Sequence, residues 1–392
     1  MTLTRTIIPA IAALTLAACG SAENPRAPYG VSWGEDVRAA QAEEVIEAEP
    51  EVEPEPEPEV VEVDPQVEKA REQLAERIKA IGEDFGGSMG IAVLDVDAGW
   101  STGYNETELF PQQSVSKTWV SLTALLLAEK GLLDLDAPVR VSREDLTLFH
   151  QPIRGEILRD GAVETTIGEL IERAIQQSDN TANNAILQRV GGPRAVRRAL
   201  ANNGLEDIRF GPGEKPMQSA IAGLLWRDEY SYENNFFDAR DRVPQESRKR
   251  AFENYLADPV DGATPLGIAR ALAAIERGEV LSEETAEKFL TIMSNTRSGP
   301  RRLKGGRPEG WVVSHKTGTG QFWNGQQSGY NDVGVLFAPD SSAYAVAVMI
   351  GVTRRPTIER MQMMQEVTRA VVAYHEALVA ANVAEAEAAV EG

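Results

Sequence analysis

The chain carries strand-like segments near both of its ends and helix-like segments between them, and this order constrains the fold more than any other feature. In residues 88–104, two apolar runs flank an Asp-Ala-Gly turn, which predicts two strands. Apolar runs near the C-terminus predict three further strands, at 311–316, 331–338 and 343–352. We expect an α/β (α+β) fold: one antiparallel sheet from the N- and C-terminal segments, helices on both faces, and a helical subdomain inserted.

Helical periodicity defines the rest of the folded body. Apolar residues at a spacing near 3.6 open it over Val67–Ile81. The same periodicity predicts helices at 169–177, 183–190, 194–204, 266–278, 282–295 and 357–380. We therefore expect a folded domain over 67–380, with a helical region at about 111–263 and an Ala/Glu-rich tail at 381–392.

The first 66 residues differ from that body. Residues 1–18 contain one early Arg, an apolar stretch and then small residues, which is the pattern of an export signal peptide. Residues 19–66 are rich in Glu and Pro and predict a disordered, extended tether. The single cysteine, Cys19, ends the string LAAC, which resembles the lipobox of bacterial lipoproteins. That resemblance implies a periplasmic protein anchored through lipidated Cys19 to a bacterial membrane, and we expect the outer membrane; the alternative is a plain secretory signal with a chance cysteine.

Charge and composition argue against several kinds of site. A formal net charge of −21 over 392 residues argues against nucleic acid and against an anionic membrane surface as electrostatic partners. The three histidines, His150, His315 and His375, are scattered without the spacing of metal ligands, and one cysteine cannot build a thiolate site. We expect no metal, no cofactor and a monomer.

Three short polar strings carry the chemistry. Ser114 and Lys117 lie three residues apart where an apolar run begins, so a helix places both side chains on one face and directs the Lys117 ammonium toward the interior. The string SDN at 178–180 lies between two helical segments, and KTG at 316–318 ends a strand. Each string alone is a weak signal, because helix lysines commonly extend to solvent and SDN commonly forms a turn or a helix N-cap.

In the order SxxK, SDN and KTG, these strings are the signature of class A β-lactamases and penicillin-binding proteins, and the chain resembles class A β-lactamases. The likeness covers most of 67–380 and includes FPQQSVSK, SDNTANNAI, GGP and KTGTG. It implies a β-lactamase/transpeptidase-like fold and a serine hydrolase that opens a β-lactam ring through an acyl-enzyme on Ser114. The alternatives are a penicillin-binding D,D-peptidase that acts on peptidoglycan stem peptides and a non-catalytic, cell-wall-binding relative.

The pair at the start of the helix explains how a serine becomes a nucleophile. A hydroxyl needs an adjacent base, and Lys117 serves as one if burial and a second cation, Lys316, disfavour its charge. The resemblance implies that Ser178 relays a proton to the leaving nitrogen and that Asn180 binds the acylamino side chain of the substrate. The resemblance further implies that Lys316 and Thr317 hold the substrate carboxylate and that the N–H groups of Ser114 and Thr319 bind the oxyanion. Gly318 is the remaining substrate-binding residue of this strand.

The resemblance also locates a base for deacylation. The family's Glu-x-x-Leu-Asn pattern, counted 36 residues from Ser178, falls on Glu214, with Gln218 in place of the Asn. In this interpretation Glu214 activates a water for hydrolysis of the acyl-enzyme, and Gln218 holds that water from the other side. The alternative is a solvated loop carboxylate without a catalytic role.

Three departures from the family pattern surround that base. The family's loop Arg is absent, since position 212 is Pro, and we expect Arg209 and Asp261 to form a substitute clasp. The chain is longer than the family around 226–262, a stretch rich in aromatic and charged residues that either covers the site or decorates the surface. Arg360, near the start of the last helix, is our candidate for an arginine that binds the substrate carboxylate.

Overall fold

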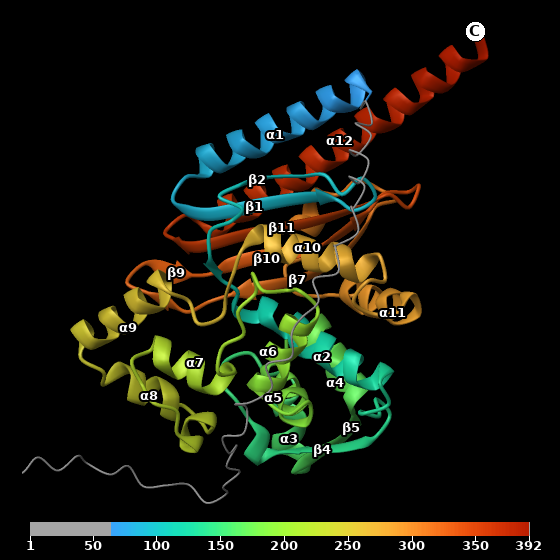
Figure 1. Ribbon diagram of the computed structural model, residues 1–392. Coiled ribbons are helices and arrows are strands. Elements are labelled where there is room, and N and C mark those ends of the chain that lie inside the picture. Colours follow the sequence, from blue (N-terminus) through green and yellow to red (C-terminus); the bar gives the residue numbers. More distant parts are fainter. Residues whose placement is uncertain (1–63, 392) are drawn as a thin grey trace, which may run out of the picture. The chain divides into compact units, whose positions relative to one another are not determined.

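The computed structural model describes residues 64–391 and builds its main sheet from both ends of that range (Figure 1). The strand order is β2-β1-β11-β10-β7, and each neighbouring pair is antiparallel. The strands are β1 (Ser88–Asp95), β2 (Ser101–Tyr104), β7 (Val312–Thr319), β10 (Tyr330–Phe337) and β11 (Ala343–Thr353). The predicted fold class is confirmed, whereas the predictions for the signal peptide, Cys19 and almost all of the tether lie outside the described residues.

Alternation along the strands separates two hydrophobic cores. Ile91 and Val93 of β1 pack with α1 (Pro65–Phe85) and α12 (Thr357–Glu391), which lie side by side on one face of the sheet (Figure 1). Ala92 and Leu94 point to the opposite face, into the core shared with α2 (Lys117–Glu129), α10 (Pro265–Glu276) and α11 (Glu283–Ser294). Helices cover both faces, which explains why the strands read as almost continuous apolar runs.

The helical subdomain surrounds α2. Trp119, Val120 and Leu122 of this helix are at most 1% exposed, and a helix that is apolar on all sides is a buried one. It is packed by α4 (Ile167–Gln176), α5 (Asn180–Arg189) and α6 (Pro193–Asn202). The subdomain also contains α3 (Arg154–Asp160) and α7 (Glu214–Ile221). A 3-10 turn, η1 (Gln113–Ser116), leads directly into α2 and is therefore fixed to the main core.

The structure extends several predicted elements. The side chain of Asp64 caps α1 by accepting the Gln66 N–H at 2.7 Å, so the folded body begins before residue 67. The last helix, expected over 357–380, continues as α12 to Glu391 through Ala and Glu, two strong helix formers. The region predicted as helical also holds small paired strands: β3 (Phe110–Pro111) with β6 (Gly262–Ala263), and β4 (Pro138–Ser142) with β5 (Ala162–Thr166).

A short hairpin beyond the KTG string was not predicted. It consists of β8 (Phe322–Trp323) and β9 (Gln326–Ser328), and β9 also pairs with β11. Asn324 and Gly325 form its turn with φ of 47° and 77°. The sequence Asn-Gly is the strongest short-range hairpin signal, so the residues did encode this turn. Within residues 64–391, no helix combines the length and the apolar content that crossing a membrane requires.

The long stretch at 226–262 folds into a 3-10 turn and two helices. These are η3 (Asp228–Ser231), α8 (Asn235–Asp241) and α9 (Gln245–Ala257). On α9, Phe252 and Tyr255 form a small separate core with Met217 and Ile221 of α7, against which Trp323 of the β8–β9 hairpin also packs. The stretch, hereafter the insert, therefore buttresses α7 from the side.

Candidate active site

The three motifs and Glu214 meet in one place, although they are spread over some two hundred residues of sequence. A cavity of about 270 Å³ lies between five segments: η1, residues 149–150, the start of α5, α7, and the end of β7 with the residues that follow it. Its lining residues are Ser114, Phe149, His150, Asn180, Glu214, Gln218, Thr319, Gly320 and Gln321. None of them belongs to the insert, so within the described part of the chain the alternative that the insert covers this cavity is not supported.

The nucleophile pair has the geometry that its spacing predicted. The Lys117 Nζ atom donates a hydrogen bond of 2.6 Å to Ser114 Oγ. Lys117 is 1% exposed, and this burial lowers its pKa, an effect that the nearby carboxylates of Glu214 and Asp179 partly oppose. A lysine whose charge is disfavoured and which touches a serine hydroxyl is positioned to accept that hydroxyl's proton.

Gln113, immediately before the nucleophile, adopts a left-handed backbone conformation with φ of 55°. Such a conformation is strained in a residue other than glycine and persists only where the surroundings enforce it. Here the Gln113 N–H donates to Asp261 Oδ2 at 2.7 Å, and its side-chain amide donates to Tyr255 Oη. Tyr255 in turn donates to Asp261 Oδ1 at 2.9 Å. The Gln113–Tyr255–Asp261 triad therefore sets the backbone that presents Ser114.

The predicted clasp between Arg209 and Asp261 is wrong. Arg209 is largely exposed and its Nη1 pairs at 2.6 Å with Asp258, another exposed residue. Asp261 is 1% exposed, and burial raises its pKa to about 6 in spite of the hydrogen bonds it accepts from Gln113 and Tyr255. The two aspartates lie three residues apart, and the sequence does not indicate which of them is buried.

Lys316 and Ser178 form the second cationic pair. Lys316 Nζ donates to Ser178 Oγ at 2.9 Å and to the Thr317 carbonyl oxygen at 2.9 Å. Lys316 is fully buried, and burial places its pKa well below the usual value, with Lys117 and Arg302 adding repulsion. Thr317 exchanges a hydrogen bond of 2.7 Å with Ser298. The structure thus brings the predicted second cation next to the nucleophile pair.

Asn180 links the SDN string to Glu214. Its Nδ2 donates to Glu214 Oε1 at 3.0 Å and to the Leu148 carbonyl at 2.8 Å. The neighbouring Asp179 caps α5, accepting the Thr181 and Ala182 N–H groups at 2.9 Å each, and burial raises its pKa. The Asn180 Oδ1 atom is buried and has no hydrogen-bond partner among the residues described, which is a common mark of a polar atom reserved for a ligand.

Glu214 is the first residue of α7 and is buried, not solvated as the alternative required. Gln218 lies one helical turn further along α7. Its Nε2 donates to Gln113 Oε1 at 2.9 Å, and its Oε1 accepts from Gln321 Nε2 at 2.9 Å. Gln218 therefore joins the nucleophile turn to the residue just after the KTG strand, a connection that the sequence did not indicate.

Arg302 is a buried arginine beside the KTG strand that the sequence analysis missed. Its Nη2 donates to Thr319 Oγ1 at 2.6 Å, its Nη1 donates to the Gly318 carbonyl at 3.0 Å, and its guanidinium lies 3.7 Å from the ring centre of Tyr330. The predicted Arg360 donates instead to the Arg355 carbonyl at 2.7 Å and does not line the cavity. In the sequence, Arg302 belongs to an Arg-Arg pair at 301–302 that precedes the KTG strand, whereas the predicted Arg360 follows that strand.

Comparison with known proteins supplies a family for this arrangement. The sequence model of the Beta-lactamase enzyme family matches residues 73–375. The chain is 27% identical over 274 residues to the imipenem-hydrolyzing β-lactamase of Enterobacter cloacae, covering 70% of this chain and 80% of that protein. It is 28% identical over 278 residues to the extended-spectrum β-lactamase PER-1 of Pseudomonas aeruginosa, covering 71% and 79%.

Solved structures agree with the sequence relatives. An ancestral class A β-lactamase superposes with a TM-score of 0.60 at 27% identity, covering 76% of this chain and 98% of that one. A β-lactamase from Chitinophaga pinensis superposes with a TM-score of 0.61 at 24% identity, covering 77% and 98%, and shares the fold. Since the family match spans more than half of the sequence and the three motif strings lie within it, the chain belongs to the β-lactamase enzyme family.

Proposed function

We propose that this protein is a class A serine β-lactamase that hydrolyses the β-lactam ring through an acyl-enzyme on Ser114. The observation that carries the proposal is the 2.6 Å contact between Lys117 Nζ and Ser114 Oγ in a cavity that also contains Glu214. The names of the relatives, which include an imipenem-hydrolyzing and an extended-spectrum enzyme, support the substrate class.

Acylation begins with proton transfer from Ser114 Oγ to Lys117 Nζ as the oxygen attacks the β-lactam carbonyl carbon. The backbone N–H groups of Ser114 and Thr319, both on the cavity wall, receive the developing oxyanion. The bond between the carbonyl carbon and the lactam nitrogen then breaks. The proton held by Lys117 passes through the Ser178 hydroxyl to that nitrogen, which returns Lys117 to its neutral form.

Deacylation uses the opposite wall of the cavity. A water gives its proton to the Glu214 carboxylate and its oxygen attacks the ester carbonyl. The proton passes to Ser114 Oγ as the ester bond breaks. Gln218 holds the water through its side-chain amide. It also fixes the position of the nucleophile turn by donating a hydrogen bond to Gln113 Oε1. A buried carboxylate next to the ester favours this activity over that of a D,D-peptidase, which remains acylated by a β-lactam.

Substrate recognition falls to the KTG strand and to Asn180. Lys316, Thr317 and Thr319 bind the substrate carboxylate, and Arg302 adds positive charge through its contact with the Thr319 hydroxyl. Asn180, whose Oδ1 lacks a partner within the described chain, binds the acylamino group. Gly318 allows the strand to pack closely against the nucleophile turn, because an added Cβ would meet the Gln112 carbonyl at 2.3 Å.

From residues 1–66 we also propose export, cleavage before Cys19, lipidation of that cysteine, and a monomeric enzyme held at the periplasmic side of the outer membrane by its Glu/Pro-rich tether. Incorporation of labelled fatty acid into wild type and not into Cys19→Ser tests this part. Absence of label from the wild type contradicts it.

Turnover of a chromogenic cephalosporin tests the central proposal. Wild type is expected to release many product molecules per enzyme, and Ser114→Ala none, with an acyl adduct detectable by mass spectrometry only in proteins that retain Ser114. Wild type that stops after one equivalent and stays acylated for hours behaves as a penicillin-binding protein and overturns the proposal.

A further inference from the structure

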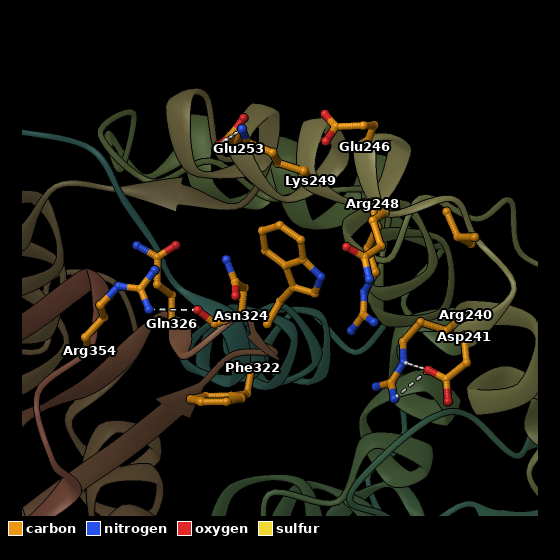
Figure 2. A pocket seen from close by; sticks show the side chains of 13 residues that line it. Arg240, Asp241, Glu246, Arg248, Lys249, Glu253, Phe322, Asn324, Gln326 and Arg354 are labelled. Carbon is orange, nitrogen blue, oxygen red and sulfur yellow. Dashed lines mark hydrogen bonds and ion pairs between the residues drawn. The ribbon is translucent and has the colours of Figure 1, made fainter.

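A second cavity, of about 750 Å³, lies between the insert and the β8–β9 hairpin (Figure 2). Helices α8 and α9 of the insert form one wall, and Phe322, Trp323, Asn324 and Arg354 contribute to the other. None of its lining residues lines the candidate active site.

Its charged side chains are not balanced. Asp241 lies 3.2 Å from Arg240, and Glu253 lies 4.0 Å from Lys249. Two of the three carboxylates that line the cavity are thereby matched with a cation. Glu246 is exposed at the start of α9, and Figure 2 shows its carboxylate pointing away from the centre of the cavity.

Arg248 is left without an anion. It is half-buried, and among the residues that the structure describes its guanidinium takes part in no ion pair or hydrogen bond. Burial lowers its pKa, and the neighbouring Arg240 lowers it further. Figure 2 shows the guanidinium groups of both arginines on the same side of the cavity. A guanidinium that has lost part of its hydration without gaining a partner is stabilised by a bound anion.

Apolar surface lies beside this charge. Phe322 is 60% exposed, an unusual state for a phenylalanine. Trp323 is half-buried, and its ring centre lies 5.7 Å from that of Phe252 on α9, so the hairpin is held against the insert. The cavity therefore offers an aromatic surface next to an unmatched cation, which suits an acyl chain that ends in a carboxylate.

The two cavities meet at one peptide bond. Gln321 lines the candidate active site, where it donates to Gln218, and Phe322 lines the second cavity. Consecutive Cα atoms lie about 3.8 Å apart, so the wall that Gln321 contributes to the active site directly adjoins the wall that Phe322 contributes to the second cavity. Asn180, which we propose to bind the acylamino group, lines the same cavity as Gln321.

We propose that the second cavity binds a carboxylate at the far end of the substrate's acylamino side chain, with Arg248 as its ion-pair partner and Phe322 against the intervening methylenes. This inference rests on the proposed function, because acylation of Ser114 fixes the reacting end of the substrate. The insert then determines specificity from beside the active site, without covering it.

Matched substrates test the inference. Cephalosporins are compared whose acyl groups of four, five and six carbons end in a carboxylate, each against the same chain ended by a methyl ester. The measured quantity is the second-order rate constant for acyl-adduct formation on Ser114 by mass spectrometry. Every protein compared, the wild type at position 248 included, carries Glu214→Gln so that the adduct accumulates. Wild type is expected to favour one or more of the carboxylates over its ester by about fivefold, the factor that about 1 kcal/mol provides.

Three variants assign that preference to a side chain. Arg248→Gln is expected to lose it, Arg248→Lys to keep part of it, and Arg250→Gln, a change to an exposed arginine on the same helix outside the cavity, to retain it. Equal rates for acids and esters in wild type, or a preference that survives Arg248→Gln, overturn the inference and leave the proposed function intact. Absence of any adduct with every substrate overturns both.

Discussion

The two walls of the active site pack into different hydrophobic cores. Ser114 and Lys117 lie where η1 leads into α2, a helix buried in the main core, and Lys316 is a fully buried residue of β7, an edge strand of the main sheet. Glu214 and Gln218 lie on α7, whose apolar residues pack in a small separate core with the insert. One wall is thus fixed by the whole domain, and the other by a local arrangement specific to this chain.

This difference separates the two half-reactions. Acylation depends on the wall that carries Ser114, Lys117 and Lys316. Deacylation depends on the wall formed by α7, which packs against Phe252 and Tyr255 of the insert. Local stability differs across a protein, and small satellite cores open at lower free energy than the main one. We therefore expect truncation of the apolar side chains that the insert packs against α7, such as Phe252, to slow deacylation more than acylation.

The largest change in rate is expected on the wall that carries Ser114 and Lys117. Lys117→Ala removes the proton acceptor that touches Ser114 Oγ, and we expect acylation to slow by about 10²–10⁴. Stopped-flow measurement of β-lactam consumption gives the rate. Lys130→Ala, at the exposed end of the same helix, is the control and is expected to act as wild type. A Lys117→Ala enzyme that acylates at the wild-type rate removes the lysine from the mechanism.

On the other wall, Glu214→Gln is expected to slow deacylation by about 10²–10³, because the water loses its base while Asn180 and Gln218 still surround it. A burst of product followed by a stable mass adduct on Ser114 reports this result. Glu206→Gln, which changes an exposed glutamate outside the cavity, is the matched control. Normal turnover by Glu214→Gln combined with an adduct in Glu206→Gln reverses the assignment.

Burial of Asp261 makes the free energy of unfolding depend on pH. Its pKa of about 6 in the folded protein exceeds the value of about 3.9 in an unfolded chain. The folded state therefore holds more protons between these values, so the stability that Asp261 contributes is complete below pH 4 and is lost as the pH rises through 6. Relative to wild type, Asp261→Asn should gain about 2 kcal/mol between pH 4 and pH 7.5.

Urea unfolding at both pH values measures this change in the free energy of unfolding. Asp258→Asn, three residues away, removes an exposed carboxylate and is the control. An equal pH dependence for Asp261→Asn and wild type means that the buried carboxylate does not titrate in this range.

The smallest effect concerns the triad that supports the nucleophile turn. Tyr255→Phe keeps the ring in the small core and removes the hydroxyl that joins Gln113 to Asp261, which should lower the free energy of unfolding by about 1 kcal/mol. Because the ring that packs against α7 is retained and the lost hydroxyl supports the turn that presents Ser114, we expect a severalfold slower acylation with a smaller change in deacylation. Equal slowing of both half-reactions would show that the two walls are not independent.

The sequence predicted the wall whose chemistry requires fixed residue types at fixed spacing. Ser114 and Lys117 had to share one helix face, and a lysine could act as a base only if buried, as it is. Arg302 escaped because its contact with Thr319 arises from the folding of the loop after α11, which no spacing rule describes. The Arg209–Asp261 clasp failed because exposure, which separates Asp258 from Asp261, depends on tertiary packing that the sequence pattern did not reveal.

The sheet order has a consequence for how the molecule is made. The innermost pairing joins Ile91 to Val348, and β7, which carries Lys316, is attached to β1 only through β10 and β11. The nascent chain therefore cannot assemble its catalytic wall until the last strand, ending at Thr353, has left the ribosome. Such long-range pairing makes folding slow, because loop closure precedes the contacts that reward it. The active site therefore first forms after Thr353 has been synthesised, close to the end of the 392 residues.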